Sequence, residues 1–217
     1  MKKVLIIGAT GSLAAYVIDA LRPLEAVDIT LFARNTNKLS ALCEVCNLHK
    51  GDALSYSDVR SAVAGQDIVY VNLAGNLEAM AKNIVKAMQE TGVKRIIAIS
   101  SIGIYDKPLR SLLIPYRALA DVIENSELDY TILRPDWFTS GDEVDYAITQ
   151  KAEPETGTAI SRKSIAAFIA SIIANPELHI NENLGISKPL QRQKRNYEHT
   201  TRKSIRQNST NQWKKVT

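Results

Sequence analysis

The chain has 217 residues, of which 45% are hydrophobic, and a formal net charge of +4. This length can bury one sizeable core but is short for two domains, so we expect one domain followed by a tail. No run approaches the roughly 18 apolar residues of a membrane span, and the first residues lead into a strand without a signal-peptide pattern. We therefore expect a cytoplasmic protein without a membrane partner.

Residues 2–14 contain the first motif. An apolar run rich in β-branched residues is typical of a buried parallel strand, and a helix follows from near Ser12. Between them Gly8 permits a tight turn, Gly11 lets the backbone approach a pyrophosphate, and Ala14 lets the helix pack closely on the strand. The free amides at the helix N-terminus form an anion site. This GxxGxxA segment predicts dinucleotide binding, with a simple turn as the alternative.

The next apolar run, residues 28–34, is predicted as the second strand, whose end should meet the adenosine ribose. An acidic residue there would accept a hydrogen bond from the 2′-hydroxyl of NAD, but this chain has Ala33 and Arg34. A guanidinium pairs bidentately with a 2′-phosphate, so NADP(H) is the preferred cofactor and NAD(H) the alternative. Arg34 as a solvated loop cation is the other interpretation.

The later segments alternate between strands and helices. Helices are predicted over residues 12–21, from Thr36, from Ser55 to 63, and over 77–90, 115–125 and 164–173, with Ser164 as the last cap. Strands are predicted at 47–50, 66–71, 95–101, 128–133 and 184–187, with Arg134-Pro135 breaking the fourth of these. The alternation predicts an α/β fold: a single doubly wound domain with a parallel sheet over residues 1–188.

Ligands of such sheets bind outside the carboxyl ends of the strands. The loops at those ends form one predicted crevice, and an adenine ring would rest near the end of the third strand. The predicted cofactor contacts are Gly8, Thr10, Gly11, Ser12, Leu13, Arg34, Asp52, Ala53, Leu73, Ala74, Gly75, Ser100 and Pro135.

The cysteines and histidines carry no predicted chemistry. Cys43 and Cys46 have only His49 nearby, and a zinc site usually needs four ligands, so no metal site is expected. Two buried or half-buried thiols are the preferred interpretation, and a redox pair is the alternative. No Ser-His-Asp arrangement is evident, because His49, His179 and His199 lie in loop-like or tail segments.

Several segments together resemble the atypical short-chain dehydrogenase/reductase family: GATG at 8–11, ARN at 33–35, GD at 51–52, SSIGIY at 100–105 and LDYTILRP at 128–135. The branch it resembles most contains NAD(P)H-binding proteins related to NmrA and to the biliverdin reductase B/flavin reductase type. The resemblance covers roughly residues 1–188. It implies a Rossmann domain whose phosphate loop, Arg34 and Asp52 contact NADP(H), and a turn after the fifth strand that lines the nicotinamide.

The chain departs from the wider family at one place. Catalytic members pair a tyrosine with a lysine four residues on, whose charge lowers the phenol pKa. Here Tyr116 is followed at that distance by Ala120, and Tyr105 by Leu109. An epimerase or a simple alcohol dehydrogenase is therefore not expected. Hydride transfer to a flavin, a quinone or a similar acceptor fits, because such molecules delocalise the charge, and a non-catalytic NADP sensor of the NmrA-like type is the alternative.

The residues assigned to catalysis are Ser100, Ser101 and Tyr116. Either serine is expected to hydrogen-bond near the nicotinamide or the small-molecule acceptor, and Tyr116 forms a wall or a donor. The alternative for the serines is that they only terminate a strand. Trp137 and Phe138 either stack on the acceptor or belong to the core.

The basic residues are concentrated at the C-terminal end. Residues 189–217 contain eight Lys or Arg and one acid, so residues 1–188 carry a net charge of about −3 against the chain's +4. This polar segment lacks apolar periodicity, which predicts a disordered or loosely docked tail. Nucleic-acid binding through phosphate contacts is the less favoured interpretation.

Overall fold

A computed structural model describes residues 1–37, 39 and 45–190 of the chain. Its strands are β1 (Lys2–Ile7), β2 (Val27–Ala33), β3 (Asn47–Lys50), β4 (Ile68–Val71), β5 (Arg95–Ile99), β6 (Asp129–Pro135), β7 (Phe138–Thr139), β8 (Ala147–Thr149), β9 (Ile160–Ser161) and β10 (Glu182–Ser187). The helices are α1 (Ser12–Leu21), α2 (Tyr56–Val63), α3 (Leu77–Thr91), α4 (Ile114–Glu124) and α5 (Arg162–Ala174), with a 3-10 turn, η1, at Ser111–Leu113.

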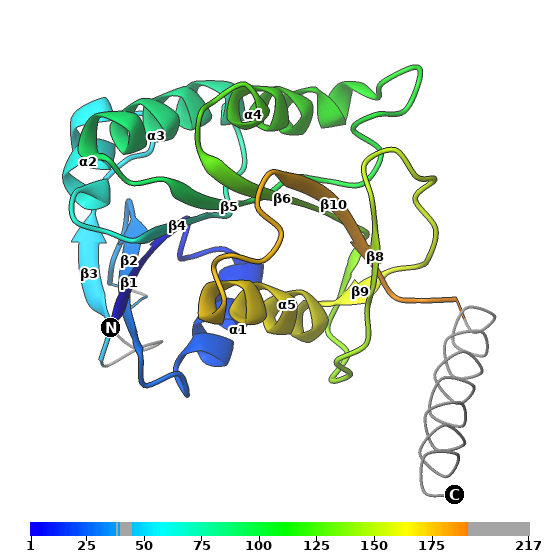
Figure 1. Cartoon of the computed structure of the whole chain (residues 1–217), viewed down its shortest axis with the longest axis horizontal. Helices are drawn as coiled ribbons and strands as arrows, with labels where there is room; N and C mark the ends of the chain where they lie inside the picture. The colour runs from blue at the N-terminus through cyan, green and yellow to red at the C-terminus, as the bar shows by residue number, and fades with distance from the viewer. Residues whose placement is uncertain (38, 40–44, 191–217) are drawn as a thin grey trace, which may run out of the picture.

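The centre of the fold is an eight-stranded sheet in the order β3-β2-β1-β4-β5-β6-β10-β8. All neighbouring strands are parallel except β8, which is antiparallel to β10. Helices α2, α3 and α4 cover one face and α1 and α5 the other, as Figure 1 shows. The strand order reverses between β1 and β4: β2 and β3 lie on one side of β1, and β4, β5 and β6 follow on the other.

Side chains of β1 alternate between two hydrophobic cores, as the pleat of a strand requires. Val4 and Ile6 pack with α1 and α5, whereas Leu5 and Ile7 pack with α2, α3 and α4. Both faces of the central strands are buried, which explains the continuous apolar runs in the sequence. The predicted doubly wound α/β fold is confirmed.

The prediction that Arg134-Pro135 breaks the sixth strand is wrong. β6 continues through Pro135, and Arg134 is paired with Gly185 of β10. Pro135 is the last residue of the strand, and its carbonyl accepts a hydrogen bond from the Ile102 amide at 3.1 Å. A proline at a strand end loses only its own N–H, so the ladder survives.

The predicted cap of the last helix is also wrong. Ser161, not Ser164, is the N-cap, and its hydroxyl accepts a hydrogen bond from the Ser164 amide at 3.0 Å. Ser164 lies buried in the first helical turn, where its hydroxyl donates to the carbonyl of Glu143 at 3.0 Å. Two serines three residues apart offer the same capping chemistry, so the sequence alone favoured the wrong one.

Some predictions fall outside the described residues. The helix predicted from Thr36 runs into residues 38 and 40–44, and the tail beyond Leu190 is likewise not described. The domain boundary at Lys188 therefore stays a prediction. Lys188 itself forms a bridge with Thr158, and the short strands β7, β8 and β9 were not predicted.

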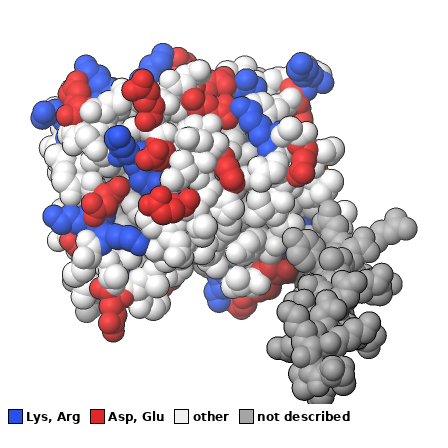
Figure 2. All heavy atoms as spheres, in the orientation of Figure 1, with Lys and Arg blue, Asp and Glu red and all other residues white. Residues whose placement is uncertain are grey.

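Charged side chains of both signs are mixed over the face of the molecule in Figure 2. Lys and Arg lie beside Asp and Glu, so the described residues on that face form no patch of a single sign. None of the helices in the described part of the chain is long and apolar enough to span a membrane.

The buried phenol of Tyr70 on β4 gives a test of the core. Its hydroxyl has no hydrogen-bond partner among the described residues, and burial raises its pKa well above the usual range. An unsatisfied buried polar group costs about 1–3 kcal/mol, so Tyr70→Phe should raise the free energy of unfolding by about 1 kcal/mol in urea denaturation. Tyr130→Phe, at a half-buried position, serves as the control. A lower stability of Tyr70→Phe would show that the hydroxyl is satisfied after all.

Candidate functional site

The loop between β1 and α1 is held in place by the loop after β4. Gly8 has φ +87°, and a Cβ there would lie 2.0 Å from the carbonyl oxygen of Asn72. A Cβ on Gly11 would lie 2.9 Å from the Asn72 side-chain nitrogen. The tight turn predicted at Gly8 is confirmed, and Gly8 excludes larger residues because the Asn72 carbonyl is so close, whereas a side chain at Gly11 would only displace the end of the Asn72 side chain.

The N-terminus of α1 is open to a ligand. Gly11 is its N-cap and supplies no side-chain hydrogen bond, so the first-turn amides keep their capacity to bind an anion. Thr10 and Ser12 are exposed. Leu13 is buried in the core, so its side chain is not available and any contact with a ligand would use its amide.

The ends of β2 and β3 bring Arg34 and Asp52 to neighbouring positions. The amide of Gly51 donates to the Ala33 carbonyl at 3.1 Å, which joins the two strand ends. Arg34 is exposed and forms no ion pair with any described residue. A cation here stands free to meet a ligand at the second strand.

The turn that contains Asp52 and Ala53 is rigid. The amide of Asp52 donates to Asp58 Oδ2 at 3.0 Å, and this bond is the main reason that the pKa of Asp58 is below its usual value. The Asp52 carboxylate accepts from the Leu54 amide at 2.9 Å, while the carbonyl of buried Ala53 accepts from Asn83 at 3.0 Å. Asp52 is half-buried, so part of its side chain stays accessible to a ligand.

The loop after β4 is the third segment of the predicted cofactor site. Leu73 is half-buried, whereas Ala74 and Gly75 are exposed. Asn76 then caps α3, with its side-chain oxygen accepting from the Ala79 amide at 3.4 Å.

The two predicted serines after β5 have different environments. Ser100 is 3% exposed, and its hydroxyl donates to the Tyr116 carbonyl at 3.1 Å. Ser101 is half-buried, and its hydroxyl donates to the Ile102 carbonyl at 3.2 Å. Tyr116 is half-buried on α4. Ser101 is therefore the more accessible hydroxyl, and Ser100 links the strand end to α4.

Arg134 precedes the buried Pro135 in β6, and its contacts join the neighbouring loops. It is 1% exposed, and its guanidinium donates to Glu155 Oε1 at 2.5 Å and to the side-chain oxygen of Asn183 at 2.6 Å. The other carboxylate oxygen of Glu155 accepts from the Gly103 amide at 2.8 Å. The Glu155 carboxylate thus joins the loop after β5 to the end of strand β6.

Tyr105 belongs to a closed polar cluster. Its hydroxyl accepts from Asn183 at 2.8 Å and donates to Glu124 at 3.3 Å, and Lys151 donates to the same carboxylate at 2.8 Å. Burial, followed by the charge of Glu124, raises the pKa of Tyr105. The phenol is therefore a weaker acid than usual, which is the reverse of what a catalytic tyrosine needs.

Three aromatic and basic residues follow β6 or begin α5. Trp137 is 74% exposed and thus does not belong to the core, whereas Phe138 is half-buried and packs against the core. The Arg162 guanidinium lies 5.3 Å from the Phe138 ring centre. Sequence reasoning missed Arg162, because it has no motif spacing to the loop at Gly8.

The cysteine prediction needs a correction. Cys46 is half-buried but disulfide-bonded, so the expectation of a thiol is wrong there; position 43 lies outside the described residues. His49 contacts Ser61 at 3.1 Å and stacks near Phe32. In the described ranges no group of His, Cys, Asp and Glu is arranged to hold a metal ion.

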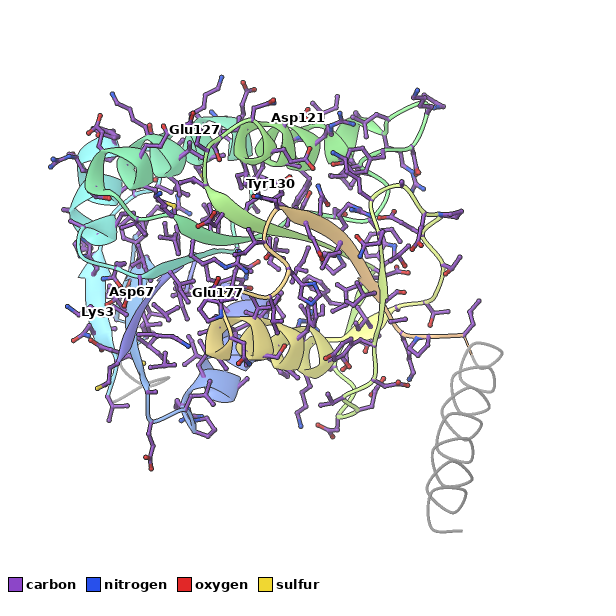
Figure 3. The ribbon with its side chains drawn as sticks, viewed as in Figure 1. Lys3, Asp67, Asp121, Glu127, Tyr130 and Glu177 are labelled. Carbon is purple, nitrogen blue, oxygen red and sulfur yellow. The ribbon has the colours of Figure 1, made fainter. Side chains whose placement is uncertain are left out.

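A cleft lies at the amino-terminal edge of the sheet, opposite the predicted cofactor site. Its volume is about 240 Å³, and its lining includes Arg95, Asp129, Asp67 and Glu177, the last two of which are labelled in Figure 3. Burial lowers the pKa of Arg95, while the two neighbouring carboxylates Asp129 and Glu177 raise it. Acidic side chains outnumber basic ones in this lining, and ligands of such sheets bind at the other edge.

A family model described as NAD(P)H-binding matches residues 8–176, which include every loop of the carboxyl edge up to α5. The chain belongs to this NAD(P)H-binding family. The predicted cofactor class is therefore confirmed, and the residues fit it: an uncapped helix N-terminus for a pyrophosphate lies one strand away from an arginine that forms no ion pair within residues 1–37, 39 and 45–190.

Solved structures of similar proteins agree with this family. A Rossmann-fold NAD(P)-binding family protein from Shigella flexneri is 43% identical, with a TM-score of 0.78 over 87% of this chain and 94% of that one. A short-chain dehydrogenase/reductase from Veillonella parvula in complex with NADP is 22% identical, with a TM-score of 0.76 over 87% and 95%. An anaerobillin reductase, ChuY from Escherichia coli O157:H7, is 20% identical, with a TM-score of 0.76 over 87% and 98%. The predicted NAD(P)H-binding Rossmann domain is confirmed, and the likeness to the short-chain dehydrogenase/reductase and to ChuY is one of fold.

The ion pair beneath the NAD(P)H-binding edge gives a stability test. Glu155→Gln should lower the free energy of unfolding by about 3 kcal/mol, because it leaves the buried charge of Arg134 uncompensated. Glu153→Gln is the matched control: Glu153 is exposed, and we expect a change below about 0.5 kcal/mol. Equal effects of the two substitutions in denaturant unfolding would contradict this role of Glu155.

Proposed function

We propose that the chain is an NADPH-dependent reductase that transfers hydride to a flavin, a quinone or a similar conjugated acceptor. The observation that carries the proposal is the uncapped N-terminus of α1 together with Arg34 at the end of the neighbouring strand β2, whose guanidinium forms no ion pair with a described residue. The helix end suits a pyrophosphate, and the guanidinium suits the 2′-phosphate that distinguishes NADP from NAD. The likeness in fold to an NADP-complexed dehydrogenase/reductase and to an anaerobillin reductase supports a reductase.

The environment of the tyrosines supports an acceptor that needs no strong acid. The residue four positions after Tyr116 is Ala120, which is fully buried in the core and leaves no space for an ammonium group. Tyr105 has a raised pKa and is held by Glu124. A conjugated acceptor that gains a hydride spreads the negative charge over its rings, and water then supplies the proton.

The protein contributes orientation. Bound NADPH supplies the hydride, and the rigid strand ends hold the reacting partners close together. We assign the Ser101 hydroxyl to a hydrogen bond near the nicotinamide, and Ser100 and Pro135 to the protein surface that the cofactor contacts. We assign Trp137 to stacking on the acceptor, because its ring is exposed at the end of β6.

The second candidate function is a non-catalytic NADP sensor of the NmrA-like type. It is favoured by the same lack of a lysine four residues after Tyr116, because a sensor needs the cofactor site but no proton donor. The two candidates differ in one observable: the reductase consumes NADPH in the presence of an acceptor, and the sensor does not.

Replacing Arg34 tests the preference for NADPH. Arg34→Glu should weaken NADP+ binding by at least tenfold more than NAD+ binding, because a carboxylate repels the 2′-phosphate. The measurement is isothermal calorimetry with both nucleotides. Arg22→Glu, which changes the charge of another exposed arginine at the far end of α1, should leave both affinities unchanged. Equal losses for NADP+ and NAD+ in Arg34→Glu would place this arginine away from the 2′-phosphate.

Steady-state kinetics with flavin and quinone acceptors tests the reaction. Purified protein should oxidise NADPH with at least one of them, and Trp137→Ala should raise the KM for that acceptor about tenfold, because a stacked aromatic pair contributes about 1 kcal/mol beyond its buried area. Leu178→Ala alters an exposed residue at the opposite edge and should leave KM unchanged. Tight NADP+ binding without turnover of any acceptor would favour the sensor.

A further inference from the structure

Arg162 connects the start of α5 to the start of α1. Its Nε lies 3.4 Å from the hydroxyl oxygen of Ser12, the first residue of α1, although 150 positions separate the two in sequence. Its Nη1 donates to the Thr139 carbonyl at 3.1 Å, and its guanidinium lies 5.3 Å from the Phe138 ring centre. These contacts fix the guanidinium beside the loop that starts at Gly8.

The fold explains this proximity. Helix α1 follows β1, and α5 precedes β10, which runs parallel to β6 within the same sheet, so both helices begin at the carboxyl edge. The two helices pack side by side on one face (Figure 1). Their N-terminal ends therefore carry two positive dipole ends next to one guanidinium.

Nothing described at this point balances that positive charge. Arg162 forms no ion pair with the described residues, whereas its neighbour Lys163 is paired with Asp142 at 2.5 Å. The hydroxyl of Thr139 is also buried and lacks a hydrogen-bond partner within the described ranges. An anion bound at the start of α1 would balance the charge of Arg162.

We propose that Arg162 binds the pyrophosphate of the dinucleotide together with the first-turn amides of α1. The inference rests on the proposed cofactor site and adds a residue from the C-terminal part of the chain to it. A guanidinium already fixed by Thr139 and Phe138 loses little freedom when it meets a phosphate, which makes the contact effective. Arg162 and Arg34 then have separate roles: Arg162 binds a group common to NAD and NADP, and Arg34 binds the 2′-phosphate alone.

Calorimetry with three probes separates these roles. The probes are NADP+, NAD+ and adenosine 2′-monophosphate, which carries the 2′-phosphate but no pyrophosphate. Arg162→Gln should weaken NADP+ and NAD+ by the same factor, about tenfold or more, because hydrogen bonds between charged groups are the stronger ones. Its affinity for adenosine 2′-monophosphate should not change.

Lys163→Gln is the matched control, because it removes the same charge from the next residue, whose ammonium is paired with Asp142. It should bind all three probes as the unaltered protein does. Circular dichroism and thermal unfolding report whether Arg162→Gln is folded; if it is not, Arg162→Lys, which keeps the charge but loses the planar fork, should show a smaller loss that is again equal for both dinucleotides.

Two results would overturn the assignment. One is an unchanged affinity of the folded Arg162 variant for both dinucleotides. The other is a loss confined to NADP+ and adenosine 2′-monophosphate, which would place Arg162 at the 2′-phosphate. Failure of the unaltered protein to bind either dinucleotide is a different result, which removes the cofactor site itself and the inference with it.

Discussion

The close approach of the Gly8 backbone to the Asn72 carbonyl is the constraint on which the carboxyl edge depends. A side chain at Gly8 would place Cβ 2.0 Å from that oxygen, so the turn after β1 exists only with glycine there. The Gly8 amide donates back to the Phe32 carbonyl at 3.2 Å, which ties the turn to β2 as well. Since three strand ends meet in this way, α1 begins with its amides directed at the crevice and without a side chain that competes for them.

The other half of the crevice is fixed by buried charge. Glu155 joins the loop after β5 to Arg134 near the end of β6, and Arg134 also binds Asn183 of β10. Burying such a pair has a free-energy cost, because both charges lose their water. Its contribution here is a fixed arrangement of the loops rather than additional stability. Of the two serines after β5, Ser101 is the more accessible, and burial raises the pKa of Tyr105 nearby. This arrangement suits the transfer of hydride to an acceptor that stabilises its own charge.

The sequence predicted the alternation of strands and helices because it depends on local signals, such as the apolar run before Gly8 and the capping serine at 55. It failed where a distant neighbour decides the outcome. Pro135 continues β6 because Ile102 reaches its carbonyl, and Ser161 caps α5 although Ser164 has the same chemistry. Arg162 was missed for the same reason, since its relation to the first loop exists only after both helices pack on one face of the sheet. The residues proposed to bind the cofactor come from the sequence through one rule, which places ligands at the carboxyl ends of parallel strands.

The most direct test of the central claim is a crystal structure of the protein with NADPH. We expect the pyrophosphate against the first-turn amides of α1, the 2′-phosphate at Arg34, and the nicotinamide above the end of β5 near Ser101. A cofactor bound at the opposite edge of the sheet, near Arg95, or phosphates that touch neither α1 nor Arg34, would contradict it.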